Sequence, residues 1–309
     1  AGSGHTNYLW NTGETTQTIY ADTAGSYNVT VGNGTPVTNS NSLSFDGNLN
    51  QKVEVPNNPN LNTISDKITI MAWVKTLGDI NGENPRIIDR SEGNGGATDR
   101  WFFNHTPTNN RLQFGVETSG GASYDITGTT NLNIGEWQFV TAVFNNGIVT
   151  LYLNGILDGS GISNKTDLSH VENVPMYIGS TNGDNSYWNG FLDEISLWNT
   201  DLNQSEIQQY MTSPPTGNEA GLVGYWNFNE GSGSSLDDLS TICTGGINTC
   251  NNGIIYSTSV PGGGNINGAT WSTDAPSLYA NNCTATDDVV VTVNPLPSID
   301  LGADTTLIC

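Results

Sequence analysis

Short segments in which apolar and polar residues alternate run through the middle of the chain, from Leu43 to Trp198. The alternation is most regular over 67–75, 111–117 and 148–154, and Gly, Asn and Asp cluster between the segments. A period of two places every second side chain on the same face, as in a β-strand that is buried on one side. The pattern therefore predicts an all-β fold, an antiparallel sandwich of many short strands.

Two local signals refine this prediction. Asn145-Asn-Gly147 separates two alternating segments. Because Asn-Gly tolerates the positive φ angles of a type I′ turn, we expect a tight hairpin there. One helix is expected at 203–211, since Asn203 is a suitable N-cap and Pro214-Pro215 follows the segment.

A series of motifs covers about half of the chain. The motifs are Leu43-Ser-Phe-Asp-Gly47, Ile70-Met-Ala-Trp-Val74, Gly135-Glu-Trp-Gln-Phe-Val140, Leu151-Tyr-Leu-Asn-Gly155, Ile178-Gly179 and Leu192-Asp-Glu-Ile-Ser-Leu-Trp-Asn199. In order and spacing they resemble the laminin-G-like, concanavalin A-like jelly-roll domains of bacterial surface proteins. The resemblance implies a jelly-roll sandwich over residues 36–275. Residues 221–271 resemble the stretch that usually opens this family, and we expect them to complete the same sandwich.

Both ends of the chain carry a second resemblance. Tyr8–Val31 and Cys283–Cys309 resemble the immunoglobulin-like (PKD-like) repeats of large secreted Bacteroidetes proteins. This implies an Ig-like β fragment at 1–35, an Ig-like terminal strand and linker at 276–298, and the first strand of the next Ig-like repeat at 299–309. We therefore expect a tandem array cut inside an Ig-like module. The alternative, that both ends are unrelated coil tails, stays open.

The charge balance narrows the range of partners. The formal net charge is -22, with only 8 Lys and Arg residues. Phosphate backbones and anionic membrane surfaces repel such a chain, so neither is an expected partner. No run of about 18 apolar residues is present, so membrane insertion is not expected. Ala1-Gly-Ser-Gly4 has no signal-peptide features, which suggests a piece of a longer, processed chain. The acidity suits a soluble secreted protein, and it is also compatible with cation binding.

The four cysteines suggest an oxidising, extracellular setting. Cys243 and Cys250 bracket a turn-forming loop, and a local disulfide is the favoured interpretation. A zinc site is less favoured, because the three histidines are scattered. Cys283 and Cys309 are separated by a proline-containing linker. We expect at least one of them to pair outside its own segment, either within the chain or with a neighbouring repeat.

Catalytic signatures are missing from the sequence. Some hydrolases of this fold use a Glu-x-Asp-x-x-Glu strand, and this pattern does not occur here. Asp193 and Glu194 are adjacent, so on a regular strand their side chains point to opposite faces. Glycoside hydrolysis needs two carboxylates that flank one bond. The sequence therefore predicts a protein that is not an enzyme.

The jelly-roll resemblance also implies a structural calcium ion. Its ligands would be the Asp of Phe-Asp-Gly and the Asp of Leu-Asp-Glu, here Asp46 and Asp193, with Asp238 as a weaker third candidate. Calcium takes six to eight oxygen ligands, and carbonyls of neighbouring turns can supply the others. The alternative is that Asp46 forms an Asx-turn and that Asp193 is solvated.

Two loops are candidate sugar sites, because sugars bind to an aromatic ring beside amide and carboxylate groups. Tyr187 and Trp188 follow Asp184, and Trp101 follows Asp99 and Arg100. For each ring, packing in the core is the competing interpretation. Trp73, Trp137 and Trp198 lie in expected strands and are assigned to the core.

Together these features predict a non-enzymatic repeat unit of a large secreted cell-surface adhesin or filament. It would act in adhesion and assemble head-to-tail with neighbouring copies of the same repeat, with glycans as a further class of partner. The alternative is a carbohydrate-binding module of a secreted polysaccharide-degrading protein. Glycan binding by the jelly roll would favour the alternative, and head-to-tail assembly without it would favour the adhesin.

Overall fold

The computed structural model describes residues 7–10, 18–19, 25–32, 35–49, 51–80, 82–91, 100–117, 123–168, 171, 174–181, 186–240, 251–257, 268–280 and 284–291. The chain divides into two compact units. The smaller unit combines Ala1–Asn33 with Asn282–Cys309, and the larger unit is Gly34–Asn281. The domain boundaries expected from the sequence stay predictions, and each unit is described by itself.

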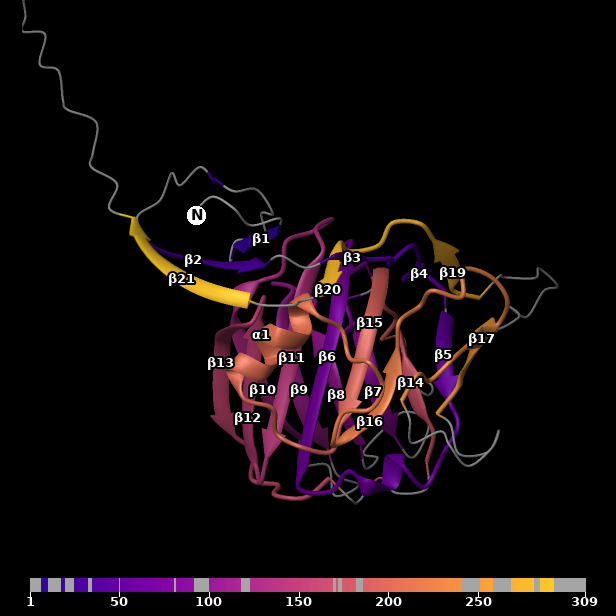
Figure 1. Ribbon diagram of the computed structural model, residues 1–309. Helices are drawn as coiled ribbons and strands as arrows, with labels where there is room; N and C mark the ends of the chain where they lie inside the picture. Colours follow the sequence, from indigo (N-terminus) through magenta and orange to yellow (C-terminus); the bar gives the residue numbers. More distant parts are fainter. Residues whose placement is uncertain are drawn as a thin grey trace, which may run out of the picture. The chain divides into compact units, whose positions relative to one another are not determined.

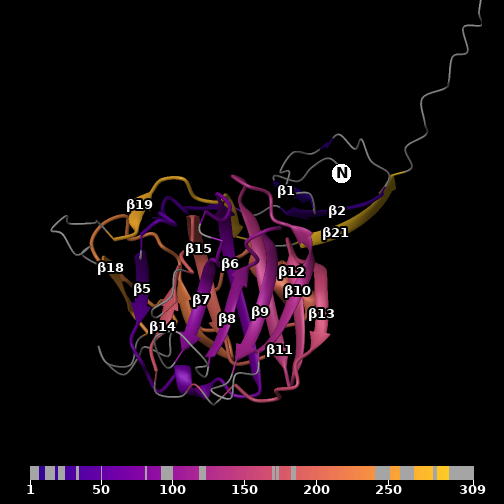
Figure 2. The ribbon, with the colours of Figure 1, turned by 180° about the vertical axis from the view of Figure 1, so that it is seen from behind.

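The larger unit contains two antiparallel eight-stranded sheets packed face to face (Figures 1 and 2). This confirms the all-β sandwich expected from the alternation. Sheet I has the spatial order β10 (Ser123–Asn131), β9 (Arg111–Glu117), β8 (Arg100–His105), β7 (Arg86–Ser91), β14 (Met176–Ile178), β5 (Gln51–Val55), β18 (Gly253–Ser257) and β17 (Ser235–Leu236).

Sheet II forms the other layer. Its spatial order is β13 (Ile156–Ile162), β12 (Ile148–Leu153), β11 (Gln138–Asn145), β6 (Lys67–Thr76), β15 (Gly190–Trp198), β4 (Ser42–Phe45) and β19 (Thr270–Ser272), and β16 (Leu222–Trp226) also pairs with β15. The late strands thus enter both sheets, since β16 pairs with β15, β18 with β5, and β19 with β4. A short 3-10 turn, η1 (Leu61–Thr63), precedes β6.

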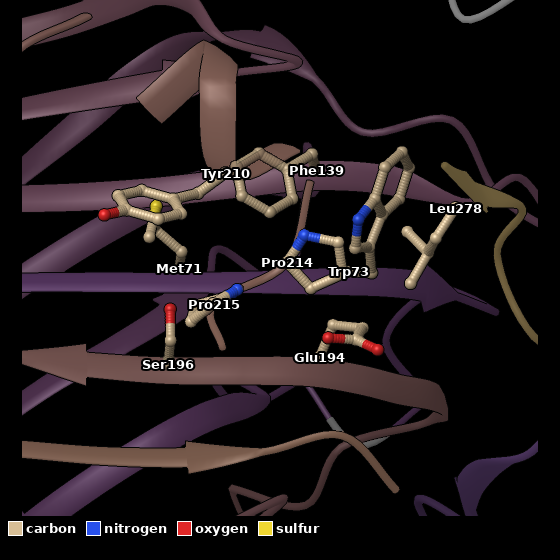
Figure 3. A pocket seen from close by; sticks show the side chains of 9 residues that line it. All are labelled: Met71, Trp73, Phe139, Glu194, Ser196, Tyr210, Pro214, Pro215 and Leu278. Carbon is tan, nitrogen blue, oxygen red and sulfur yellow. The ribbon is translucent and has the colours of Figure 1, made fainter. Parts of the chain in front are cut away.

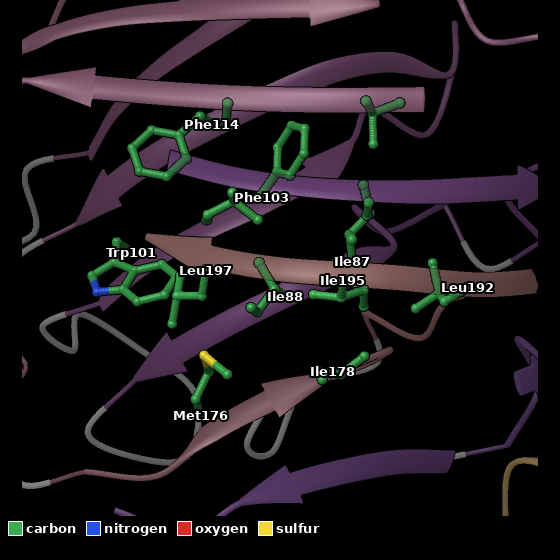
Figure 4. Close-up of a cluster of buried hydrophobic side chains, with 14 of the residues drawn as sticks. Ile87, Ile88, Trp101, Phe103, Phe114, Met176, Ile178, Leu192, Ile195 and Leu197 are labelled. Carbon is green, nitrogen blue, oxygen red and sulfur yellow. The ribbon is translucent and has the colours of Figure 1, made fainter. Parts of the chain in front are cut away.

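The core lies between the two sheets. Figure 4 shows side chains of both layers meeting there, with Trp101, Phe103 and Phe114 from sheet I and Ile195 and Leu197 from sheet II. All five are fully buried. Burial of one such side chain contributes about 1.5–3 kcal/mol, so the inward row of every strand stabilises the sandwich.

The two local predictions are confirmed. Asn146 and Gly147 have φ angles of 47° and 88° at the turn between β11 and β12, as a type I′ turn requires. The helix α1 (Gln204–Thr212) has Asn203 as its N-cap, and the Asn203 side chain accepts hydrogen bonds from the backbone N–H groups of Ser205 and Glu206. Glu206 Oε2 accepts one from the Asn203 N–H at 2.7 Å, which completes a capping box.

A small pair of strands belongs to the larger unit but to neither layer. β3 (Thr35–Val37) pairs with β20 (Leu278–Ala280). Residues 276–280 therefore belong structurally to the larger unit.

The smaller unit is a three-stranded antiparallel sheet with the order β1 (Asn7–Trp10), β2 (Gly25–Gly32) and β21 (Thr284–Val291). β2 and β21 pair along eight residues, from Gly25 opposite Val291 to Gly32 opposite Thr284. Trp10 and Val29 are its buried apolar side chains among the described residues. Strands from both flanks of the larger unit thus share one sheet, while the Ig-like nature of this unit stays a prediction. In the described part of the chain, no helix is long and apolar enough to cross a membrane.

Candidate functional site

The three carboxylates predicted to hold calcium lie at separate places. Asp46 is exposed at the end of β4, and its Oδ1 accepts hydrogen bonds from the backbone N–H and the side-chain Nδ2 of Asn48 at 2.9 and 3.1 Å. This is the Asx-turn that the sequence left open as an alternative. Asp193 is fully buried, and its two oxygens accept from the Glu194 N–H at 2.8 Å and from Asn39 Nδ2 at 2.7 Å.

The register of β4 and β15 separates Asp46 from Asp193. Phe45 pairs with Gly190 and Leu43 with Leu192, so Asp193 lies level with position 42. Asp46 is four residues further along β4, which is about 13 Å at the rise of a strand. The structure therefore does not bring the two carboxylates to one ion.

Asp238 is also committed to structural hydrogen bonds. Oδ1 accepts from the N–H groups of Tyr225 and Ser240, and Oδ2 accepts from Asn251. Among the described residues, no group of three His, Cys, Asp or Glu side chains is arranged to hold a metal ion. Asp46, Asp193 and Asp238 therefore do not form one cluster of metal ligands in the described part of the chain, and a structural calcium ion stays a prediction.

The predicted sugar-binding tryptophans are in the core. Trp101 and Trp188 are both 0% exposed. Trp188 packs edge-on against His105, with 5.2 Å between ring centroids. A ring that is buried on both faces cannot stack on a sugar, so packing is the correct interpretation for both. Tyr187 is partly exposed in the segment before β15.

One predicted sugar-contacting residue and all four cysteines lie in other parts of the chain. Asp184, Cys243, Cys250, Cys283 and Cys309 lie outside the described residues. The sugar-contacting role of Asp184, the local disulfide and the pairing of the other two cysteines stay predictions.

The register of sheet II brings a different set of side chains together. Lys75 of β6 pairs with Phe191 of β15, Phe191 pairs with Ser44 of β4, and Ser44 pairs with Thr270 of β19. Trp137 directly precedes Gln138, which pairs with Val74, so it continues the same row beside Lys75. We call these five residues the rim row. Their neighbours Val74, Leu192 and Leu43 point into the core, so the rim row lies on the outer face.

The rim row combines aromatic rings with polar groups. Its members are partly or fully exposed. The rings of Trp137 and Phe191 lie 6.2 Å apart at 53°, and Lys75 Nζ is 5.6 Å from the Phe191 ring centroid. Asp274 joins the row, because its Oδ1 accepts from Trp137 Nε1 at 2.9 Å and its Oδ2 pairs with Lys75 Nζ at 2.7 Å. Such a surface suits a ligand with both apolar faces and hydroxyl groups.

Electrostatics keep Asp274 charged. Partial burial acts to raise the pKa of Asp274, but hydrogen bonds from Lys75 and Trp137 outweigh it and hold this pKa below its ordinary value. Lys75 and Asp274 therefore neutralise each other, and their side chains keep exposed fractions of 20% and 40%. No direct signal for this site is present in the sequence, because Trp137 lies beside a strand with apolar residues on both faces.

A β-bulge in β15 places two carboxylates beside the next row of the outer face. Asp193 pairs with Trp73, whereas Ser196 pairs with Met71, so β15 contains one extra residue between these pairs. Glu194 occupies the bulge with a φ angle of 50°. The expectation that Asp193 and Glu194 point to opposite faces is wrong, since it assumed a regular strand. Both lie on the outer side of the sheet, where Glu194 lines a hollow with Trp73 and Ser196 (Figure 3).

Burial controls the ionisation of this pair. Burial raises the pKa of Glu194 to about 8, against the opposing effect of a hydrogen bond that Tyr225 donates to Glu194 Oε2 at 2.5 Å. Burial and then the charge of Glu194 raise the pKa of Asp193 well above its ordinary value. With exposed fractions of 0% and 6%, Asp193 and Glu194 do not present two carboxylates to a substrate. This arrangement is unlike the open acid pair of a glycoside hydrolase.

Comparison with solved structures found matches at low sequence identity. A candidate carbohydrate-binding protein from Bacteroides ovatus is 18% identical, with a TM-score of 0.55 over 85% of this chain and 72% of that chain. A SAP-like pentraxin from Limulus polyphemus is 14% identical, with a TM-score of 0.46 over 67% of this chain and 98% of that chain. A comparison with curated proteins found no match.

A family profile gives the most specific result. Residues 45–208, more than half of the chain, match the concanavalin A-like lectin/glucanases superfamily. The match covers β5 to β15, the strands that form most of both layers. The Bacteroides ovatus protein shares the fold. The chain therefore belongs to the concanavalin A-like lectin/glucanases superfamily.

Proposed function

We propose that this protein is a non-catalytic carbohydrate-binding domain that holds a neutral glycan along the rim row. The observation that carries the proposal is the row itself, with two rings, an ammonium group and two hydroxyls on one outer face. Membership in a superfamily of lectins and glucanases supports it. The Bacteroides ovatus protein with the same fold, a candidate carbohydrate-binding protein, is consistent with it.

The geometry of the row favours an extended ligand. The row crosses the strands at right angles, from Trp137 to Thr270. With about 4.8 Å between neighbouring strands, its length is about 19 Å. Aromatic rings contact the apolar faces of sugar rings, while Lys75, Asp274, Ser44 and Thr270 reach hydroxyl groups between and beside them. A glycan of several units can therefore use the whole row.

The charge of the protein favours a neutral ligand. The net charge of -22 repels acidic polysaccharides at long range. Within the row, Asp274 already neutralises Lys75, so no cationic group is left over for a carboxylate or sulfate of a glycan. Neutral polysaccharides are the expected ligands, and acidic ones are the expected non-binders.

Replacement of Trp137 tests the site. Trp137→Ala in the whole chain should weaken binding of a neutral oligosaccharide roughly fivefold or more, because an aromatic contact with its buried area contributes about 1–3 kcal/mol. The ligand is chosen from a panel of neutral and acidic glycans, and binding is measured by isothermal titration calorimetry. Phe191→Ala should act in the same direction.

Tyr152→Ala provides the matched control. Tyr152 is a partly buried aromatic residue on the same outer face, on β12, away from the rim row. The control should bind as the unchanged protein does. Equal binding by Trp137→Ala, or binding by the panel's acidic glycans alone, would show that the rim row is not the site.

The wider setting stays a prediction from the sequence. A role as a repeat unit of a secreted adhesin or filament, partners among neighbouring copies and a structural calcium ion were expected from the two resemblances. Glycan binding by the rim row is compatible with that setting and equally with a module of a polysaccharide-degrading protein. We propose the carbohydrate-binding role because the rim row supports it in either context.

A further inference from the structure

A second feature of sheet II is a small hollow that the rim row does not use. It opens to solvent and has room for about one water-sized group. Figure 3 shows aromatic rings from β6, β11 and α1 around it, with Glu194 and Ser196 of β15 on the sheet side. The residues used below are Trp73, Phe139, Tyr210, Glu194 and Ser196.

Glu194 brings an unused acceptor to the hollow. Its side chain is 94% buried, since its exposed fraction is 6%. Oε2 accepts the Tyr225 hydroxyl, whereas Oε1 accepts no hydrogen bond from the described part of the chain. Ser196 Oγ accepts from Trp198 Nε1 at 3.0 Å and has a second lone pair. Oε1 is open toward the hollow, where water or a ligand N–H group can donate to it.

The surroundings of Glu194 are negative. The charges of Glu194 and of Glu230, which follows β16, both act on Asp193, the neighbour of Glu194 on β15. The uncharged groups that contact the pair are Asn39 and Tyr225. Among the described residues whose charge affects Asp193 or Glu194, none is a cation. Without a neighbouring cation, burial favours the protonated, uncharged form of Glu194, and a bound cation would favour the ionised form.

We infer that the hollow binds a primary ammonium group, from a small amine or from a lysine side chain of a partner. The ammonium N–H groups would donate to Glu194 Oε1 and Ser196 Oγ. The faces of Trp73, Phe139 and Tyr210 would attract its positive charge, as aromatic rings do. A metal ion fits less well, because the described part of the chain offers no group of three metal-binding side chains.

Ammonium binding is linked to protonation. Burial raises the pKa of Glu194 to about 8 when the hollow holds no cation. A bound cation favours the ionised carboxylate, so binding at pH 7.5 should release a proton. The titratable groups beside Glu194 are Asp193 on the same strand, Tyr225 on β16 and Tyr210 on α1. Glu230 acts on Asp193, and Glu219 acts on both tyrosines. Burial raises the pKa of both tyrosines, so both stay neutral.

Methylammonium chloride tests the inference with the whole chain at pH 7.5. Against sodium chloride of equal ionic strength, it should raise the unfolding midpoint in a saturable way. Calorimetry in two buffers of different ionisation enthalpy should show proton release. Glu194→Gln should weaken the apparent affinity at least fivefold. Glu54→Gln, the same change at a partly exposed carboxylate of β5, should leave it unchanged.

Further probes distinguish a free amine from a lysine side chain, and a second variant tests the role of Glu194. Tetramethylammonium has no N–H group and should give no saturable effect. N-acetyl-lysine amide distinguishes a lysine side chain from a free amine, and binding by either supports the site. Should Glu194→Gln not fold, Tyr225→Phe keeps the carboxylate but removes a hydrogen bond that lowers its pKa. Its affinity should fall at pH 7.5 and recover by pH 9.

Three results would overturn the inference. The first is an equal effect of methylammonium on the unchanged protein and on Glu194→Gln. The second is an equal effect of tetramethylammonium and methylammonium. The third is no saturable effect at all, in which case the hollow holds water only. Each result leaves glycan binding at the rim row untouched, because Trp137 and Phe191 do not line the hollow.

Discussion

At the scale of single residues, Gly179 shows where the backbone accepts only glycine. It follows β14 with a φ angle of 78°, and an added Cβ would lie 2.2 Å from the Phe45 ring. Gly179→Ala should lower the free energy of unfolding by about 2–5 kcal/mol, the sum of a left-handed conformation and an overpacked core. Urea unfolding measures this loss.

Gly82 separates the two causes. Its φ angle is 74°, but an added Cβ meets no atom within 4 Å. Gly82→Ala should therefore cost only the backbone part, about 1–2 kcal/mol. If both variants lose the same stability, the contact with Phe45 contributes nothing and the explanation for Gly179 fails.

Individual aromatic residues were the least predictable part of the site. Trp101, Trp137 and Trp188 each lie in or beside an expected strand or loop, and sequence alone does not tell which ring faces solvent. Trp101 and Trp188 are fully buried and Trp137 is partly exposed. The difference arises from register and layer, which depend on strands far away in the sequence. Local pattern therefore predicted sugar contact for two tryptophans that are buried, and it assigned the partly exposed Trp137 to the core.

At the scale of elements, α1 is the part that local sequence predicted best, because its signals are local. Asn203→Ala should cost about 0.5–2 kcal/mol, since it removes the acceptor for the Ser205 and Glu206 N–H groups. Gln209→Ala, at an exposed position of the same helix, should be nearly neutral. Thermal or urea unfolding of the two variants makes the comparison, and an equal loss would mean that the capping box is not needed.

The strands divide according to their surroundings. β9 and β12 alternate cleanly because one face of each meets the core and the other meets solvent. β6 and β11 carry apolar residues on both faces, because α1 and Leu278 pack on their outer side. The bulge in β15 gave no signal either, since Glu194 holds a left-handed conformation that is uncommon for a residue with a side chain. Periodicity thus predicted the strands but not their exceptions.

At the scale of the whole molecule, composition and alternation were enough to predict a β-sandwich. They were not enough to predict that β2 and β21 pair within one chain. This pairing joins residues near both ends of the sequence, and no local pattern reports such a contact. The partners of β16, β18 and β19 are likewise fixed by the complete register of both sheets and not by local pattern.

The pH dependence of stability belongs to the whole molecule, because ionisable groups in different parts of the fold contribute to it. Folding lowers the pKa of some of these groups and raises the pKa of others. Burial lowers the pKa of His105, so the folded state binds fewer protons than the unfolded state below about pH 6.5. Stability is then lost as the pH falls. The lowered pKa values of Glu219 and Asp274 act in the same direction.

Glu194 and Asp193 give the opposite slope. The pKa of Glu194 rises from 4.5 to about 8 on folding, so between these values the folded state binds the extra proton. The stability that this bound proton contributes is fully present below pH 4.5 and is lost as the pH rises through about 8. The pKa of Asp193 is raised as well and adds to the loss. The unfolding midpoint, measured in sodium chloride without amines, should therefore pass through a maximum near pH 5–6 and fall toward pH 8.5.

Glu194→Gln isolates the alkaline side of this curve. The amide cannot ionise, so the fall between pH 6 and 8.5 should become shallower, with Asp193 responsible for what remains. The acid side should not change, because His105, Glu219 and Asp274 are untouched. Glu54→Gln should reproduce the full curve of the unchanged protein. An alkaline slope that stays the same in Glu194→Gln would mean that the bulge carboxylate is already ionised at neutral pH, and the buried proton must then be sought at Asp193.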